Sequence, residues 1–248
     1  MNPIRYIKDY QSLTSNDIFI SSFPKSGNTR FRMAMAKYFS LLSTSNIKFS
    51  YDFVNSLLPE MGKGNISSAR KKMSSLGLNN DQLLVKSHLP FNQLKHLYKK
   101  CKIIYIIRPE PVTIMSFYDY SLARNIIDNN TSFSTFLRAK KTGIESLVKS
   151  YKSYKDAEAI INYNDLMKDD LHSIFQALEK IEFNYDPEIL KKSILATRRE
   201  HTALIKNSLD KDSYNFAAKK TRSIDNYFSS EDKIYYNQVV ADTIFTQI

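Results

Sequence analysis

The fold is decided by residues 18–42, which read IFISSFPKSGNTRFRMAMAKYFSLL. The run begins with Ile18-Phe19-Ile20, an apolar segment typical of a strand that is covered on both faces in a parallel sheet. It ends with apolar residues at the i, i+4, i+7 and i+11 spacing of one helix face, namely Phe31, Met35, Tyr38 and Leu42. Between the two lies a polar loop with a single glycine, Gly27. The stretch therefore predicts a strand, a loop and a helix.

The strand pattern recurs three times along the chain. Apolar runs at residues 83–85, 103–107 and 159–161 each end in polar residues: Lys86-Ser87-His88, Arg108-Pro109 and Asn162-Tyr163-Asn164-Asp165. Residues 170–181 carry a helical pattern, and Ser229 with a carboxylate three residues later predicts a capping box. This alternation predicts an α/β fold with a central parallel sheet flanked by helices, in which ligands bind beyond the carboxyl ends of the strands. Residues 49–80 are interpreted as a helical excursion covering a substrate pocket.

The composition indicates a single folded domain over residues 1–248. The net charge of +11 suits nucleic acid, an anionic membrane or a polyanionic small molecule, without choosing among them. Two lysine doublets, Lys71-Lys72 and Lys140-Lys141, are interpreted as solvated helix faces. The single cysteine, Cys101, is interpreted as a packing residue and fits a reducing compartment. No apolar run reaches the about 18 residues that span a bilayer, so we expect a soluble, cytoplasmic protein without a transmembrane segment.

The loop at residues 22–30 joins the first strand to the first long helix. Free backbone N–H groups and the helix dipole make such a junction an anion site. Gly27 allows close backbone approach, and Lys25 adds a positive charge. The loop is not a Walker A motif, in which the lysine follows the second glycine, because Lys25 precedes the glycine here.

Four segments follow one another along the chain: FPKSGNT (23–29), VKSHLP (85–90), IYIIRPEPVTIMSFY (104–118) and YNDLM (163–167). Together they resemble the family of sulfotransferases that use 3′-phosphoadenosine-5′-phosphosulfate (PAPS). The first resembles the family's 5′-phosphosulfate loop, the second the segment with the catalytic histidine, and the third the 3′-phosphate segment. The resemblance implies a P-loop-kinase-like fold. It also implies transfer of a sulfuryl group from PAPS to a hydroxyl or amine, with release of adenosine 3′,5′-bisphosphate (PAP).

The resemblance gives three residues catalytic roles. Lys25 is expected to stabilise the bridging oxygen as its bond to sulfur breaks, and Lys86 to contact the sulfuryl oxygens. His88 is expected to take the proton of the acceptor, a role that its ordinary pKa of about 6.5 suits. Such chemistry needs positioning and cationic stabilisation. Because a sulfuryl group carries less charge than a phosphoryl group, we expect no metal requirement.

The resemblance also implies a set of nucleotide-binding residues. The 5′-phosphate is expected to contact the loop, and the 3′-phosphate Arg108 and Ser116. Tyr163 either approaches the nucleotide or is only a packing residue. The full set is Lys25, Ser26, Gly27, Asn28, Thr29, Arg30, Arg108, Ser116, Tyr163, Lys220 and Arg222.

Several positions depart from the family pattern. Arg30 stands where many members have a tryptophan that stacks on adenine, and a planar guanidinium can also stack there. The C-terminal R-K-G loop is not recognisable, which leaves Lys219, Lys220 and Arg222 as the cations expected to close over the nucleotide. The dimerisation motif of many animal members is absent, so the oligomeric state is open.

Two other functions compete with this interpretation. A nucleotide kinase or other P-loop phosphotransferase has a similar core, but the chain lacks G-K-[ST] and a strand-end carboxylate suited to Mg²⁺. A basic nucleic-acid-binding module would leave the ordered motifs unexplained, and we expect no nucleic-acid partner. The acceptor is a small molecule or glycan of open identity. Four aromatic residues are candidates for either an apolar acceptor pocket or the core: Phe91, Phe117, Tyr118 and Tyr120.

Overall fold

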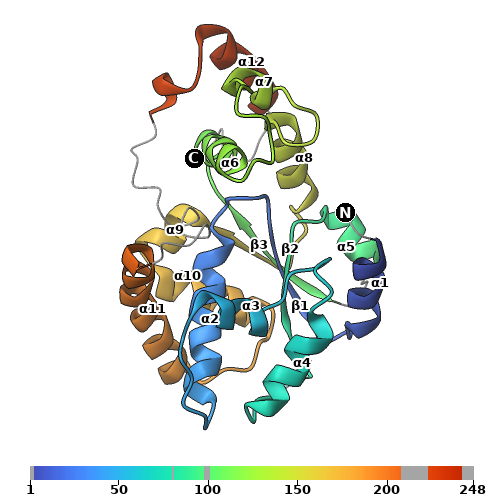
Figure 1. Cartoon of the computed structure of the whole chain (residues 1–248), viewed down its shortest axis with the longest axis vertical. Coiled ribbons are helices and arrows are strands. Elements are labelled where there is room, and N and C mark those ends of the chain that lie inside the picture. The colour runs from blue at the N-terminus through green and yellow to red at the C-terminus, as the bar shows by residue number, and fades with distance from the viewer. Residues whose placement is uncertain (1–2, 80, 98–100, 208–222, 242–248) are drawn as a thin grey trace.

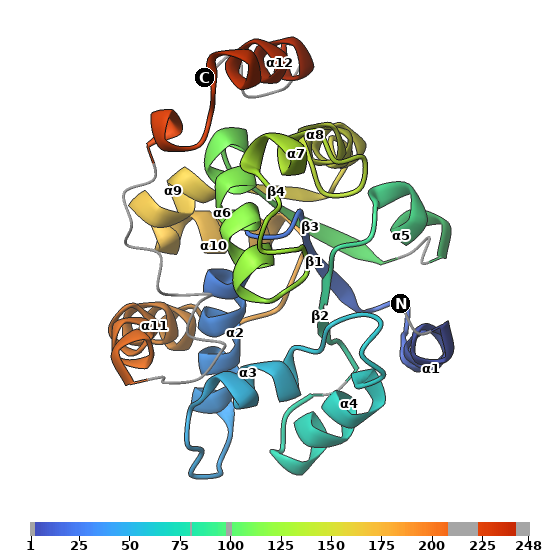
Figure 2. The same ribbon diagram turned by 45° about the horizontal axis from the view of Figure 1, so that its top comes forward.

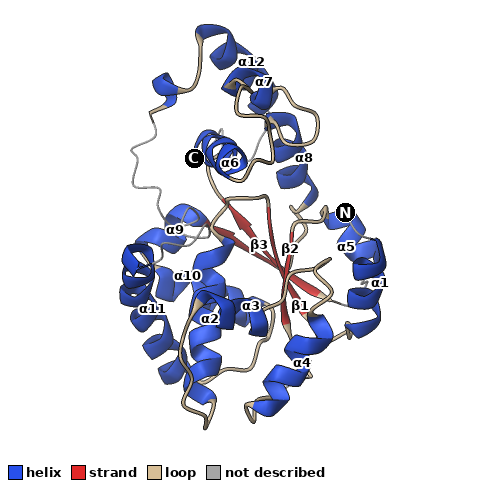
Figure 3. Ribbon diagram, viewed as in Figure 1, coloured by secondary structure: helices blue, strands red, loops and turns tan. Residues whose placement is uncertain are grey.

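The computed structural model describes residues 3–79, 81–97, 101–207 and 223–241. Within these residues a four-stranded sheet has the strand order β2-β1-β3-β4. The strands are β1 (Ile18–Ser22), β2 (Leu84–Ser87), β3 (Lys102–Ile107) and β4 (Ala159–Asn162). All neighbouring pairs are parallel. The carboxyl ends of the four strands therefore lie at one edge of the sheet (Figure 1 and Figure 3).

Helices cover both faces of the sheet, so β1, β2 and β3 are largely buried, whereas Ile160 of the edge strand β4 is exposed. Every residue of β1 is buried, and its three apolar residues have no exposed surface. A strand covered on both faces shows a continuous apolar run rather than an alternating one, which is why the sequence pattern located it. The predicted α/β class, with its central parallel sheet, is confirmed.

The helices fall into groups that are visible in Figure 1 and Figure 2. On one flank lie α2 (Asn28–Leu42), α9 (Tyr163–Lys168), α10 (Asp170–Lys180) and α11 (Pro187–Asn207). Beyond the carboxyl ends of the strands lie α6 (Glu110–Ala123), α7 (Phe133–Leu137), α8 (Ile144–Ser153) and α12 (Ser230–Val240). The others are α1 (Pro3–Ser12), α3 (Tyr51–Leu57), α4 (Ile66–Ser75), α5 (Phe91–Leu97) and the short 3₁₀ helix η2 (Ile224–Asn226). No helix in the described ranges is long and apolar enough to cross a membrane.

The excursion at residues 49–80 is helical, as predicted, and it adds to the edge of the sheet. The amide of Lys86 donates to the carbonyl of Pro59 at 2.8 Å, and the amide of Met61 donates to the carbonyl of Lys86 at 2.9 Å. This short parallel bridge places Glu60 beside Lys86. The excursion therefore supplies a carboxylate to the end of β2.

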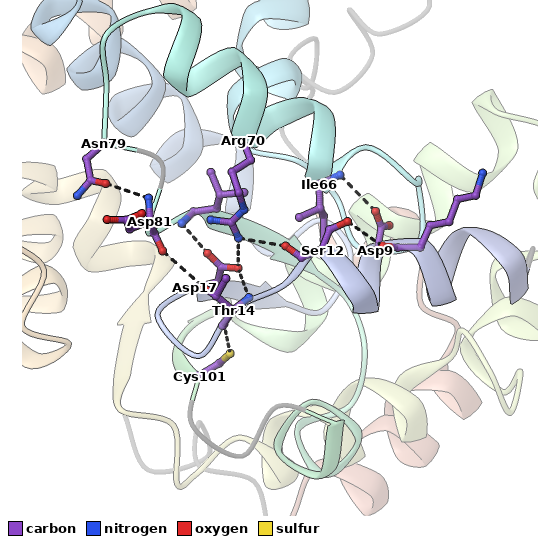
Figure 4. Close-up of polar contacts among 11 residues, drawn as sticks. Asp9, Ser12, Thr14, Asp17, Ile66, Arg70, Asn79, Asp81 and Cys101 are labelled. Carbon is purple, nitrogen blue, oxygen red and sulfur yellow. Dashed lines mark hydrogen bonds and ion pairs between the residues drawn. The ribbon is translucent and has the colours of Figure 1, made fainter.

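Two buried carboxylates fix the opposite, amino-terminal side of the sheet (Figure 4). Asp9 of α1 accepts hydrogen bonds from the backbone N–H groups of Gly62, Gly64 and Ile66 at 2.8–3.2 Å. Asp17 accepts from the guanidinium of Arg70 at 2.6 Å and from two backbone N–H groups. These bonds tie α1 and α4 to the start of β1. Buried Cys101 lies in the same region, with its Sγ 3.4 Å from the carbonyl of Thr14.

Candidate active site

The loop between β1 and α2 turns at two residues with positive φ. Lys25 has a φ of 70° and Gly27 a φ of 103°, and the amide of Ser26 donates to the carbonyl of Phe23 at 3.2 Å. Gly27 is the N-cap of α2 and has no side chain to cap the first helical turn. The backbone N–H groups of that turn and the positive end of the helix dipole therefore form an anion-binding cradle.

The side chains of the predicted loop residues divide between the interior and the site. The side-chain amide of buried Asn28 donates to the backbone carbonyl of Ile20 at 3.0 Å, so this side chain is turned toward β1. Ser26 is fully buried, and its Oγ lies 3.4 Å from the hydroxyl of Tyr151. Thr29 is half-buried. The backbone, rather than these buried side chains, is what the loop offers to an anion.

Residues from three strand ends meet at Gly27. A Cβ atom at Gly27 would lie 2.6 Å from Cε2 of Tyr163 and closer still to Cδ2, so the aromatic ring lies directly against the glycine. The guanidinium of Arg108 is 4.5 Å from the centroid of the same ring, and it donates to the carbonyl of Lys25 at 3.0 Å. The fold thus brings together four of the residues predicted from the sequence.

Lys25 points from the loop toward α6. Its Nζ lies 4.8 Å from the centroid of the Tyr120 ring, a cation–π contact. Ser116 is buried on the same helix, which follows Arg108 in the chain. Lys220 and Arg222 lie outside the described residues, as does Lys219.

The ring of His88 is oriented by the end of β1. Its Nδ1 is 2.6 Å from the carbonyl oxygen of Ser22. A carbonyl can only accept, which assigns the proton to Nδ1 and leaves Nε2 unprotonated. Packing around the ring lowers the pKa of His88 and the charge of Lys86 acts in the same direction, although the residue is exposed where it faces the pocket. The site therefore holds a neutral imidazole with one nitrogen ready to accept a proton.

Lys86 is paired with Glu60. The Lys86 Nζ lies 3.0 Å from Oε2 of Glu60. Burial raises the pKa of Glu60, but nearby cations, above all Lys86 through its charge and hydrogen bond, outweigh it and leave that pKa below its ordinary value. Burial also lowers the pKa of Lys86, which the charge of Glu60 opposes. Glu60 belongs to no local motif, so nothing in the sequence pattern pointed to it.

Arg30 contacts a carboxylate on a neighbouring helix. Its guanidinium forms an ion pair with Asp170, which also binds Arg198. Burial raises the pKa of Asp170, but hydrogen bonds from the two arginines outweigh it and lower the pKa. In this pair the side chain of Arg30 is 11% exposed. Stacking of Arg30 on adenine stays a prediction.

A layer of buried tyrosines supports the site from behind. The hydroxyl of Tyr151 donates to the carbonyl of Arg108 at 2.6 Å and accepts from the amide of the same residue at 3.2 Å. Tyr154 stacks on Tyr105 with ring centroids 3.7 Å apart, and its hydroxyl bonds Ser21 at 2.7 Å. Sequence reasoning missed this layer. The signal was the i, i+3 spacing of the two tyrosines at α8.

A cavity of about 690 Å³ opens beside His88. Its lining consists of Phe23, Pro24, His88, Pro90, Asn92, Phe117, Lys140, Lys141, Glu145, Ser146, Lys149, Ser150 and Ser153. Of the four candidate aromatic residues, Phe117 lines it, while Phe91 and Tyr118 pack against core aromatics. The lining comes from segments other than 49–80. The helix-face interpretation of Lys140-Lys141 is wrong, since both lie in the turn before α8; Lys71 and Lys72 do lie exposed on α4.

The parallel sheet, the anion-binding loop and the cationic strand ends define a P-loop-like α/β protein. The family model described as the sulfotransferase domain matches residues 15–232. The chain therefore belongs to the sulfotransferase family.

Individual relatives are distant. Sulfotransferase 1B1 of the dog (Canis lupus familiaris) is 25% identical over 196 residues, which cover 75% of this chain and 65% of that protein. The crystal structure of mouse sulfotransferase SULT7A1 complexed with PAP superposes with a TM-score of 0.65 at 18% identity, covering 94% of this chain and 85% of the other. Retinol dehydratase in complex with androsterone and inactive cofactor PAP gives a TM-score of 0.56 at 18% identity, with 98% and 87% covered. These structural likenesses establish the fold.

Proposed function

We propose that this protein is a PAPS-dependent sulfotransferase, which transfers a sulfuryl group to a hydroxyl or amine and releases PAP. The observation that carries the proposal is the meeting of Lys25, His88 and Arg108 around one anion-binding loop. Family membership supports it, and so do two structural neighbours that are complexes with PAP.

The loop and its neighbours fit the nucleotide. An uncapped helix N-terminus suits the 5′-phosphate, because its N–H groups and dipole favour negative charge. The planar fork of Arg108 suits the 3′-phosphate, and its contacts to Lys25 and Tyr163 hold it at the strand ends. Tyr163 both packs against Gly27 and lies at the edge of the cradle.

The reaction moves one bond and one proton. The bond between sulfur and the oxygen of the 5′-phosphate breaks while a bond between sulfur and the acceptor oxygen or nitrogen forms. The acceptor's proton goes to Nε2 of His88, whose Nδ1–H is held by Ser22. Lys25 neutralises the charge that develops on the departing phosphate oxygen. Lys86 turns toward the sulfuryl oxygens, a role for which it exchanges Glu60 for substrate.

The proposal extends to the acceptor and the setting of the enzyme. The acceptor is a small molecule or glycan, and one domain over residues 1–248 carries the activity. A cytoplasmic location is supported by the single cysteine. Nucleic acid has no role in this proposal.

The test is PAPS consumption across phenol, sterol and sugar acceptors, with His88→Ala as the key variant. Loss of the general base should lower kcat about 10²–10⁴-fold, while calorimetry should give an unchanged PAP affinity because the imidazole faces the acceptor. The lowered pKa of His88 keeps the base neutral below its ordinary pKa of 6.5. The acid limb of kcat/KM in the wild type should therefore lie below that pH. Wild-type turnover in His88→Ala, or an acid limb above pH 6.5, would contradict the assignment.

A further inference from the structure

The cavity beside His88 has a cationic wall. Lys140 and Lys141, from the turn before α8, and Lys149, from α8 itself, line it together. All three side chains are exposed. Across the described part of the chain, none of the three is in ion-pair contact with a carboxylate. Three lysines therefore line one open cavity, and none of them forms an ion pair within the described residues.

The lining also contains one acidic residue, Glu145, which only partly offsets the three lysines. Glu145 precedes Lys149 by four residues on α8, a spacing that favours an ion pair on a helix surface. Instead, the carboxylate of Glu145 accepts a hydrogen bond from the hydroxyl of Tyr235 on α12 at 2.8 Å. The tyrosine hydroxyl carries no charge, so Glu145 offsets part of the positive charge, and three lysines against one carboxylate still leave an excess of cations in the lining.

The end of the cavity at His88 is apolar. Phe23 and Phe117 lie edge to face with ring centroids 5.5 Å apart, and two prolines complete this end. Asn92 and three serines of α8 also line the cavity. A volume of about 690 Å³ suits a ligand of drug-like size, which pockets of roughly 300–1,000 Å³ enclose. The lining thus combines apolar surface and His88 with three lysines from α8 and the turn before it.

We infer that the acceptor is an anionic hydroxyl compound. Its reacting hydroxyl sits on an apolar, ring-like body at His88, and a carboxylate, sulfate or phosphate at its other end binds the three lysines. The inference rests on the proposed function, because it assigns the substrate class of the same site. A neutral acceptor fills only the apolar end and leaves the lysines to water, so the enzyme prefers the acid over its uncharged analogue.

The experiment compares acceptors that differ only in charge. One pair is 4-hydroxyphenylacetate and 4-hydroxyphenylacetamide, and a longer pair is 4′-hydroxybiphenyl-4-carboxylate and its amide. Sulfate and phosphate monoesters of the same lengths, each with its phenolic hydroxyl left free, show which anion is favoured. Exposed ion pairs are individually weak, so three of them should raise kcat/KM for the acid about tenfold over the amide. The preference should shrink as salt is added, because salt screens exposed charges.

The variants separate this site from general surface charge. Combined Lys140→Gln, Lys141→Gln and Lys149→Gln should bring the acid-to-amide ratio close to one. Lys152→Gln removes an exposed charge from the same helix, outside the cavity lining, and should keep the wild-type ratio. PAP binding, measured by calorimetry, should be the same in all of these proteins.

The outcomes distinguish the two proposals. If PAP binds and no acid outperforms its amide, whether both react equally or neither reacts, the anionic-acceptor inference is overturned while the nucleotide site stands. The inference also fails if Lys152→Gln lowers the ratio as much as the triple variant. If PAP does not bind to the wild-type protein, the proposed function itself fails, and the inference falls with it.

Discussion

Gly27 is the residue on which the nucleotide cradle depends most closely. Residues with a side chain rarely adopt its φ of 103°, and the ring of Tyr163 fills the space that a Cβ would occupy. A β-carbon there would strain the backbone and also push the ring, together with the stacked Arg108, away from the loop. The phosphate site therefore has two independent reasons to require glycine.

Gly27→Ala should weaken PAP binding and lower stability together. A left-handed backbone costs a non-glycine residue about 1–2 kcal/mol, and the clash with Tyr163 adds to this. Gly77→Ala is a matched control, because Gly77 has a φ of +70° and nothing lies within 4 Å of the place that a Cβ would take. That variant should lose only the backbone part of this stability and should keep its PAP affinity. Equal PAP affinity in Gly27→Ala and the wild type, by calorimetry, would show that the loop does not hold the phosphate closely.

The strand-end residues could be predicted because each motif is local. Lys25, His88 and Arg108 each follow an apolar run, and parallel strands place their ends at one edge. Their partners could not be predicted in the same way. Glu60 and Asp170 come from distant segments with no motif of their own, and only the fold brings them to the site.

At the scale of elements, α12 shows how a predicted local motif acquires a long-range role. The structure confirms the capping box between Ser229 and Asp232. Asp232 also accepts a hydrogen bond from Ser134 of α7 at 2.8 Å and forms an ion pair with Arg138. The cap was readable because its two residues are neighbours in the chain. Its bond to α7 depends on packing that no short pattern records.

Asp232 should contribute a measurable part of the acid sensitivity of the fold. Burial raises the pKa of Asp232, but hydrogen bonds from Arg138 and Ser134 outweigh it and lower the pKa from 3.8 to about 2. The carboxylate therefore stabilises the folded state above the ordinary pKa, and this stability is lost as the pH falls toward the lowered one. Between pH 5 and pH 3 the loss should be about 1 kcal/mol.

Urea unfolding at both pH values measures this contribution. Asp232→Asn is less stable than the wild type at pH 5, and its stability should fall by about 1 kcal/mol less on acidification. Other carboxylates titrate equally in the two proteins, so the difference isolates Asp232. An identical pH dependence of stability in wild type and variant would show that Asp232 does not contribute to the acid sensitivity.

At the scale of the whole molecule, the order of the motifs along the chain says more about fold and function than the composition does. The net charge of +11 allowed three classes of partner, whereas four motifs at strand ends, in a fixed order along the chain, indicated one family. The role of individual charges can be inferred only from the fold, which places Lys140 and Lys141 in the lining of a cavity. A count of lysines carries no information on which of them converge.

Because β1, β3 and β4 all contribute to the nucleotide site, binding should stabilise the molecule as a unit. PAP at 100 times its dissociation constant should add about 2.7 kcal/mol to the free energy of unfolding. For a chain of this size that corresponds to a rise in Tm of roughly 5–10 °C. Arg108→Ala should give a much smaller rise at the same PAP concentration, since it removes the expected 3′-phosphate contact, while Lys71→Ala on the exposed face of α4 should match the wild type.

ATP with Mg²⁺ is the decisive comparison, because a P-loop kinase binds that pair, whereas the cradle described here has no G-K-[ST] sequence and places Arg108 for a 3′-phosphate that ATP lacks. A larger rise in Tm with ATP and Mg²⁺ than with PAP, undiminished in Arg108→Ala, would contradict the sulfotransferase proposal and indicate a phosphotransferase instead.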